Sequence, residues 1–353
     1  MRVGIVTVQD SNNFGSFLQA YAFQTVLQEM GHEVYFIRSR SKKYIRNIFY
    51  HIKPGKQELV HFPSFFCTNW IGWKKYKRFQ KEQKCFDVID NFKDELVDVV
   101  ILGSDEIWNV QNSVFQRPIF YGEKMQRVMA YAVSIGNSTY EDMRCIPKKW
   151  IKKISPILSR DVHTSRFLKM LNIDSPVVCD PTFLVDKSIF KRKYESALFN
   201  GKPYILVYSY GLNEQMVSQI KEFAKKNDLR ILSACFPFAW CDGVFECAAL
   251  DFCAVLEQAE YVFTSTFHGT IFSILNHKQF VSYPQSRKTR ELLDSLGMSE
   301  RLIDVEDCMI TNLEGKFMNK EIDYIEIDNR IKKMKKDSLE LLKEGLKQYE
   351  NNI

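Results

Sequence analysis

Residues 2–37, RVGIVTVQDSNNFGSFLQAYAFQTVLQEMGHEVYFI, contain the pattern that decides the fold. Arg2 to Val8 is a short apolar run rich in β-branched residues, which is typical of a buried parallel strand. The polar residues 12–16 predict a loop, and apolar residues then recur at helical spacing up to Gly31, a residue typical of helix ends. Glu33 to Ile37 predicts the next strand. This strand–helix–strand unit is the usual opening of a doubly wound α/β sheet.

The same alternation continues along the chain and then starts again. Apolar runs predict further strands at Val97–Leu102, Arg127–Ile135, Ile157–Ser159 and Val177–Cys179. The charged stretch from Asp186 to Lys202 lacks periodicity, and we interpret it as a domain boundary. New strands are then predicted at Tyr204–Tyr208, Arg230–Ala234, Tyr261–Thr264 and Gln279–Tyr283. We therefore predict two Rossmann-like domains that face a central cleft, residues 1–186 and 187–330. An amphipathic helix at 331–353 is expected to pack back on the first domain.

The composition limits the classes of protein to consider. A length of 353 residues favours two domains, and no run of eighteen apolar residues is present. The N-terminus lacks the features of a signal peptide, so we expect a cytoplasmic protein. Nine cysteines without a paired framework predict reduced thiols. Four of them recur every six residues, but close C-x-x-C pairs are missing, and we expect no metal site there: Cys235, Cys241, Cys247 and Cys253.

A basic and aromatic segment interrupts the first domain as a predicted helical insertion at about 38–94. Residues 38–84 carry thirteen Lys and Arg against only Glu58 and Glu82, with aromatic residues interleaved. One interpretation is a solvated insertion whose aromatic side chains pack on the domain beneath it. The other is a surface that meets an anionic partner, for which we expect peripheral contact with an anionic membrane at its cytoplasmic face rather than nucleic acid.

The strongest candidate for chemistry is the segment TSTFHGT at 264–270. His268 lies between a predicted strand end and a helix start, where it suits phosphate binding or proton transfer near neutral pH. Ser265 and Thr266 precede it, and Gly269 permits close backbone approach to a ligand. The first N–H groups of the helix favour an anion. The alternative is a structural histidine that satisfies a buried carbonyl group.

Two more polar loops follow predicted strands. The run LGSDEIWN at 102–109 contributes Gly103, Ser104, Asp105, Glu106 and Asn109. Its adjacent carboxylates suit the binding of sugar hydroxyls or the role of a general base, although ordinary turn and capping use also explains Ser104 and Asp105. The second loop supplies further cleft residues at the start of the first helix: Asn13, Gly15 and Ser16. This loop contains neither of the two nucleotide-binding glycine motifs, G-x-G-x-x-G and G-x-x-x-x-G-K-[ST].

Cationic side chains complete the candidate set. Arg160 follows a predicted strand, where a guanidinium suits a carboxylate or a phosphate, unless it forms a structural pair with Asp161. Three cations open a predicted helix, where positive charge opposes the helix dipole and therefore hints at an anionic ligand: Arg287, Lys288 and Arg290.

The ordered set of these motifs resembles the polysaccharide pyruvyl transferase family. The set comprises the loop and helix at 13–20, ILGSDEIWN at 101–109, YAVSIG at 131–136, SRD at 159–161, DPTFL at 180–184 and TSTFHGTIFSI at 264–274. The resemblance runs from about residue 3 to about 301. It implies a GT-B-like fold and transfer of pyruvate from phosphoenolpyruvate to two hydroxyls of a sugar as a ketal. The acceptor would be a polysaccharide or a lipid-linked oligosaccharide.

The resemblance also implies roles for individual residues. Arg160, Arg290 and Arg287 would bind the donor anion, His268 would be a phosphate ligand or general acid, and Asp105 an acceptor-side base. No metal or cofactor is needed besides the co-substrate phosphoenolpyruvate. One position departs from the pattern, because many members have an Arg directly before the aromatic–His–Gly run and this chain has Thr266.

Two other functions stay open on the sequence alone. One is a GT-B glycosyltransferase that uses a nucleotide-sugar donor, and the other is a non-catalytic module that binds an anion or a membrane.

Overall fold

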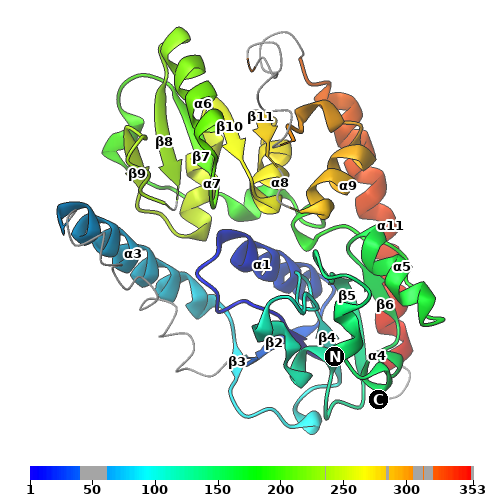
Figure 1. Ribbon diagram of the computed structural model, residues 1–353. Helices are drawn as coiled ribbons and strands as arrows, with labels where there is room; N and C mark the ends of the chain where they lie inside the picture. The colour runs from blue at the N-terminus through cyan, green and yellow to red at the C-terminus, as the bar shows by residue number, and fades with distance from the viewer. Residues whose placement is uncertain (40–61, 235, 284–285, 305–312, 314–320, 351–353) are drawn as a thin grey trace.

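The computed structural model describes residues 1–39, 62–234, 236–283, 286–304, 313 and 321–350. Its first half contains a parallel sheet in the order β3-β2-β1-β4-β5-β6 (Figure 1). The strands are β1 (Arg2–Val6), β2 (Glu33–Ile37), β3 (Val88–Ile89), β4 (Val99–Leu102), β5 (Val128–Val133) and β6 (Ile157–Ser159). The helices of this half are α1 (Phe14–Glu29), α3 (Phe62–Glu82), α4 (Lys148–Lys152) and α5 (Val162–Met170).

The second half repeats this architecture. Its sheet is also parallel and has the order β11-β10-β7-β8-β9. The strands are β7 (Tyr204–Tyr208), β8 (Arg230–Ala234), β9 (Gly243–Phe245), β10 (Tyr261–Thr264) and β11 (Gln279–Ser282). The helices are α6 (Glu214–Lys226), α7 (Ala249–Gln258), α8 (Phe267–Leu275) and α9 (Arg287–Leu296), and the long α11 (Tyr324–Glu350) follows them.

Both sheets reverse their strand order next to their first strand. In the first sheet, β1 pairs with β2 on one side and β4 on the other; in the second, β7 pairs with β8 and β10. Ligands of open α/β sheets bind at such switch points, beyond the carboxyl ends of the strands. The loops after β1, β4, β7 and β10 are therefore the places where a site is expected.

Helix α1 joins the two halves. Its first residue, Phe14, is 1% exposed, and its ring lies 4.7 Å from that of Phe252 on α7 and 5.3 Å from that of Tyr208 at the end of β7. On the sheet side, Phe23 stacks on Tyr131 of β5 at 4.9 Å. Because both faces of α1 are covered, it is apolar nearly all round. One hydrophobic core therefore runs through both halves.

The C-terminal helix packs back on the first half, which confirms the prediction, although it begins at Tyr324 rather than 331. The Ser338 hydroxyl accepts a hydrogen bond from Cys179 N–H at 3.0 Å, and the Tyr349 hydroxyl donates to the Val128 carbonyl at 3.0 Å. The red helix in Figure 1 also passes the second half, where Asp328 lies 3.1 Å from His277.

Two element predictions are wrong. Val177–Cys179 is not a strand, because it makes only a single bridge, between Ser159 and Val177. The insertion predicted at 38–94 contains β3, which pairs with β2 and thus belongs to the sheet. Within the insertion, α3 is helical as predicted, whereas residues 40–61 lie outside the described part of the chain.

Among the described residues, no helix is both long enough and apolar enough to cross a membrane.

Candidate active site

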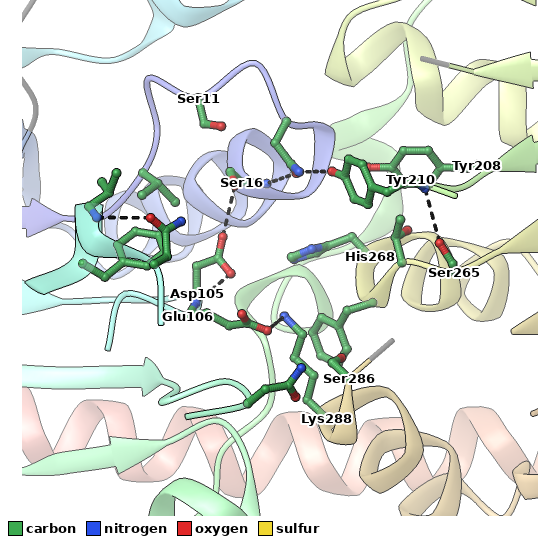
Figure 2. A pocket seen from close by; sticks show the side chains of 18 residues that line it. Ser11, Ser16, Asp105, Glu106, Tyr208, Tyr210, Ser265, His268, Ser286 and Lys288 are labelled. Carbon is green, nitrogen blue, oxygen red and sulfur yellow. Dashed lines mark hydrogen bonds and ion pairs between the residues drawn. The ribbon is translucent and has the colours of Figure 1, made fainter. Parts of the chain in front are cut away.

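A pocket of about 460 Å³ lies between the two halves, at the carboxyl ends of both sheets (Figure 2). The first half lines it with Val8, Ser11, Asn13, Ser16, Asp105, Glu106, Asn112, Val114, Phe115 and Asn137. The second half lines it with Tyr208, Tyr210, Ser265, Thr266, Phe267, His268, Ser286 and Lys288. Its volume falls in the range typical of small-molecule sites. The loops that follow both switch points thus form one site.

The structure brings many of the predicted residues to this pocket. Those that line it are Asn13, Ser16, Asp105, Glu106, Ser265, Thr266, His268 and Lys288. Other predicted residues do not line the pocket but contact the lining residues or lie in the same loops: Gly15, Gly103, Ser104, Asn109, Arg160 and Gly269. Two predicted donor-binding cations, Arg287 and Arg290, are exposed on α9 and do not line the pocket.

The start of α1 connects the two halves at the pocket. Asn13 caps the helix, because its side-chain oxygen accepts a hydrogen bond from Ser16 N–H at 3.1 Å. Its amide donates to the Tyr210 hydroxyl of the second half. The Ser16 hydroxyl donates to Asp105 at 3.1 Å. Gly15 packs directly on the His268 ring, which a Cβ at this position would overlap. A glycine is therefore required where the two halves meet.

The loop after β4 holds Asp105 in an uncommon backbone conformation. Its φ is +87°, in the left-handed region that residues other than glycine rarely adopt. Two hydrogen bonds hold it there: its carboxylate accepts from Glu106 N–H at 2.8 Å, and its carbonyl accepts from Ser134 N–H at 3.2 Å. The buried Ser104 hydroxyl donates to Gln19 at 2.6 Å, which ties the loop to α1. Such strained positions cluster at functional sites.

A network of four ionisable side chains, Asp105, Arg160, Asp180 and His268, lies beside the pocket. Arg160 is buried, with a side chain only 1% exposed, and it lies 3.4 Å from Asp105 and 3.3 Å from Asp180. The Asp180 oxygen that faces Arg160 also lies 3.4 Å from His268 Nε2. The predicted partner Asp161 instead caps α5 by accepting from Thr164 N–H at 2.7 Å. Arg160 thus neutralises two carboxylates beneath the pocket instead of pointing into it.

The network controls the ionisation of its carboxyl groups. Burial alone would raise the pKa of Asp105, but Arg160, Lys288 and His268 outweigh it and lower this pKa to about 2. Burial also opposes ionisation of Glu106, and the nearby Lys288 and Arg160 nevertheless lower its pKa. The pKa of Asp180 is likewise lowered, because His268 and Arg160 outweigh burial. All three carboxyl groups are therefore ionised at neutral pH.

Lys288 is the cation that α9 brings into the pocket. Its Nζ lies 2.5 Å from Glu106 and 4.7 Å from the centre of the Phe267 ring, and its side chain is only 12% exposed. Arg290 lies two residues further along the helix and pairs with Asp304 on the surface, with 48% of its side chain exposed. Helical rotation by about 100° per residue separates these neighbours in direction. The sequence identified the cationic cluster but not the member that faces the pocket.

Thr266, the position that departs from the resemblance described above, has a structural role. It caps α8, since its hydroxyl accepts a hydrogen bond from Gly269 N–H at 2.9 Å. The hydroxyl also lies 3.0 Å from that of Thr264. A Cβ on Gly269 would overlap both threonine hydroxyls, which explains the glycine.

Sequence reasoning missed some residues of the site. Asp180 belongs to the DPTFL motif, but no role was assigned to it, because its contact with His268 joins residues 88 positions apart. Tyr208 and Tyr210 line the pocket at the end of β7, and their place after a predicted strand was the available signal. In the described part of the chain, no group of three or more His, Cys, Asp or Glu side chains is arranged to hold a metal ion.

Comparisons with known proteins agree with this architecture. The fold is similar to the UDP-GlcNAc 2-epimerase from Neisseria meningitidis bound to UDP-GlcNAc, with a TM-score of 0.53, 11% identity, and coverage of 96% of this chain and 99% of that chain. It is also similar to the Methanocaldococcus jannaschii UDP-GlcNAc 2-epimerase in complex with UDP-GlcNAc and UDP. That TM-score is 0.52, with 13% identity and coverage of 91% and 94%. At such low identity the likeness concerns the fold alone, and it confirms the predicted GT-B-like class.

The sequence itself matches a family model described as polysaccharide pyruvyl transferase over residues 13–287. A comparison with curated proteins finds no match. The family match spans the lining residues from Asn13 to Ser286.

Proposed function

The chain belongs to the polysaccharide pyruvyl transferase family, and we propose that it transfers the pyruvyl group of phosphoenolpyruvate to two hydroxyls of one sugar as a ketal. The acceptor is a sugar of a polysaccharide or of a lipid-linked oligosaccharide. The observation that carries this proposal is the division of the pocket (Figure 2). The first half contributes Asp105 and Glu106, and the second half contributes His268 and Lys288, which pairs with Glu106. A small anion and a polyhydroxyl acceptor need these two kinds of partner.

We assign the donor anion to Lys288 and to the start of α8. The first N–H groups of α8, together with the helix dipole, favour an anion at this place. The Lys288 ammonium is within reach of the same space, and an incoming phosphate or carboxylate would compete with Glu106 for it. Lys288 thus supplies the positive charge that the uncharged side chain of Thr266 does not provide. This assignment replaces Arg160 and Arg290, whose guanidiniums are engaged outside the pocket.

The reaction requires one proton donor and two hydroxyl nucleophiles. A proton is delivered to the methylene carbon of phosphoenolpyruvate, and one sugar hydroxyl adds to the adjacent carbon. The bond to phosphate then breaks, and the second hydroxyl closes the ketal ring. Of the two hydroxyl protons, one balances the proton that was delivered to carbon, and the other leaves with the phosphate. We assign the proton donor to His268, which lines the pocket and has the ionised Asp180 behind it.

The acceptor would lie against Asp105 and Glu106. A carboxylate whose pKa is about 2 is a weak base, since the best general bases have a pKa near the working pH. We therefore assign Asp105 to accepting hydrogen bonds from the sugar hydroxyls and to orienting them, instead of removing their protons.

The direct test is release of inorganic phosphate from phosphoenolpyruvate in the presence of candidate lipid-linked glycans. We expect acceptor-dependent release, and a pyruvyl ketal on the glycan by mass spectrometry. A thermal-shift comparison of phosphoenolpyruvate with a nucleotide-sugar panel tests the competing glycosyltransferase function. Stabilisation by a nucleotide sugar alone, without phosphate release, would contradict the proposal.

We also propose that α3 brings the protein to an anionic membrane at its cytoplasmic face. Trp70 and Trp73 are 55% and 48% exposed and stack at 5.4 Å. Lys77 lies over the Trp73 ring at 5.6 Å, and Lys74 lies over the Trp70 ring at 5.3 Å while also pairing with Glu246 at 2.8 Å. Amphipathic rings beside ammonium groups suit the headgroup region of an anionic bilayer. The other end of α3 packs inside, where Phe79 is fully buried.

Vesicle flotation tests this surface. The chain should float with vesicles that contain anionic lipid and lose this binding when Trp70 and Trp73 are both replaced by Ala. Equal binding to neutral vesicles would contradict an electrostatic contribution.

A further inference from the structure

Four aromatic residues of the second half form a continuous strip that begins in the pocket. We define the aromatic strip as Tyr210, Phe236, Phe238 and Trp240. The ring centres of Tyr210 and Phe236 lie 5.4 Å apart, those of Phe236 and Phe238 6.0 Å, and those of Phe238 and Trp240 5.5 Å. Tyr210 lines the pocket, and Figure 2 shows it on the second-half wall, with Tyr208 and Ser265. The strip thus leads from the pocket along the loop that follows β8.

The outer end of the strip is explained by packing. Phe238 and Trp240 are half-buried and lie against the hydrophobic cluster that covers one face of the second sheet. They anchor the loop after β8, a role that ordinary loop aromatics have.

The pocket end is packed less completely, although the Tyr210 ring lies 6.3 Å from that of the core residue Tyr208. Within the described part of the chain, Tyr210 and Phe236 belong to none of the three hydrophobic clusters. Tyr210 is 49% exposed, and Phe236 is half-buried. Two adjacent aromatic rings beside a pocket leave apolar surface in contact with water, which costs free energy. A ligand that covers the rings would remove this cost.

The Tyr210 ring is also held in place from the other half. Its hydroxyl accepts a hydrogen bond from the amide of Asn13, the residue that caps α1. On the far side of the strip, the Lys75 ammonium of α3 lies 5.8 Å from the centre of the Phe236 ring. A ring that is fixed before binding loses little conformational entropy when a ligand stacks on it.

We propose that Tyr210 and Phe236 form a second acceptor subsite, which stacks the sugar unit next to the one that receives the pyruvyl group. The C–H groups on the face of a sugar ring carry partial positive charge and pack on the electron-rich face of an aromatic ring. Asp105 and Glu106 bind the hydroxyls of the first sugar deeper in the pocket. This inference rests on the proposed function and deepens it. The acceptor is therefore an oligosaccharide of at least two units, not a free monosaccharide.

The test measures binding of the full chain to an array of polysaccharide fragments of one to six sugars, with phosphoenolpyruvate present. Wild-type protein should bind fragments of two or more sugars in preference to monosaccharides. Phe236→Ala and Tyr210→Ala should weaken that binding at least tenfold, whereas Phe236→Trp should retain it. Met170→Ala removes an exposed apolar side chain outside both the strip and the pocket and should leave that binding unchanged.

Several outcomes would overturn the subsite: unchanged binding by Phe236→Ala, a wild-type preference for monosaccharides, or no fragment bound at all. Loss of uridine monophosphate binding in the strip variants, with glycan binding intact, would assign the strip to a nucleobase instead. Phosphate release from phosphoenolpyruvate is followed in parallel. If wild-type protein turns over but the strip variants keep full oligosaccharide activity, the subsite fails and the proposed function stands. If no protein releases phosphate, the proposed function itself fails.

Discussion

The two halves share one strand order but end their strands in different chemistry. After β4, the first half presents two carboxylates, Asp105 and Glu106, above the buried Arg160. After β10, the second half presents His268 at the start of a helix, with Lys288 beside it. The same backbone geometry thus positions two carboxylates in the first half and a histidine with a lysine in the second.

This difference separates the location of a ligand site, which the repeated fold determines, from the chemistry of that site, which it does not. The parallel sheet determines where a ligand binds, because the carboxyl ends of its strands meet at one edge. The side chains in the loops determine what binds. The experiments below are chosen to separate the roles of the two halves.

The largest expected effect comes from the second half. Replacing His268 by Gln should lower kcat by about 10²–10⁴-fold, as is typical when a general acid is lost, and should change the KM for phosphoenolpyruvate little. Steady-state phosphate release measures both constants. Asp180→Asn should lower kcat less and should have little further effect in the His268→Gln background, because it acts through the histidine. Turnover close to wild type in His268→Gln would show that the histidine is structural.

A substitution in the first half should instead lower the stability of the folded protein. Arg160→Met leaves Asp105 and Asp180 without their buried cation, which is expected to cost about 3–5 kcal/mol in the free energy of unfolding. Urea denaturation measures this change. If stability is instead preserved and the KM for phosphoenolpyruvate rises tenfold, Arg160 binds the donor, as the sequence alone suggested.

The third experiment compares two cations of one helix. Lys288→Met should raise the KM for phosphoenolpyruvate about tenfold, equivalent to about 1.4 kcal/mol, because it removes the cation that faces the pocket. Arg290→Met is the matched control and should change KM less than about twofold, since exposed ion pairs contribute little. The reverse result would return the donor role to Arg290.

The last experiment concerns the contact between the halves. Glu82 of α3 is buried, accepts a hydrogen bond from Ala249 N–H at 2.9 Å and pairs with Arg192 at 3.1 Å. Burial, followed by the charge of Asp251, raises the pKa of Glu82 to about 7. The folded state therefore binds this proton more tightly than the unfolded chain, so the associated stability is present at low pH and lost as pH rises through about 7.

Glu82→Gln should remove this dependence. Between about pH 5 and about pH 8, wild-type stability should fall by about 2 kcal/mol more than that of the variant, because each unit by which folding raises the Glu82 pKa corresponds to about 1.4 kcal/mol. Urea denaturation at both pH values tests this. Parallel pH profiles for the two proteins would mean that Glu82 stays ionised throughout.

The sequence alone predicted much of the fold and the location of the site. Strand periodicity and turn residues are local properties, and they correctly indicated two parallel sheets with polar loops at their carboxyl ends. They also identified Asp105, Glu106 and His268, which line the pocket. The short β3 was missed, because a two-residue strand has no periodicity to detect.

Only the tertiary structure decided how these residues are paired. Arg160 contacts Asp105 and Asp180, 55 and 20 positions away, and His268 meets Asp180 across the two halves. It also decided that Lys288, not Arg290, faces the pocket, and that Tyr210 and Phe236 lie side by side at its rim. The physical reason is that local sequence determines which backbone conformation each segment adopts. Which charge lies near which other charge, and how far each is buried, depends on segments that are distant in the chain and that meet only on folding.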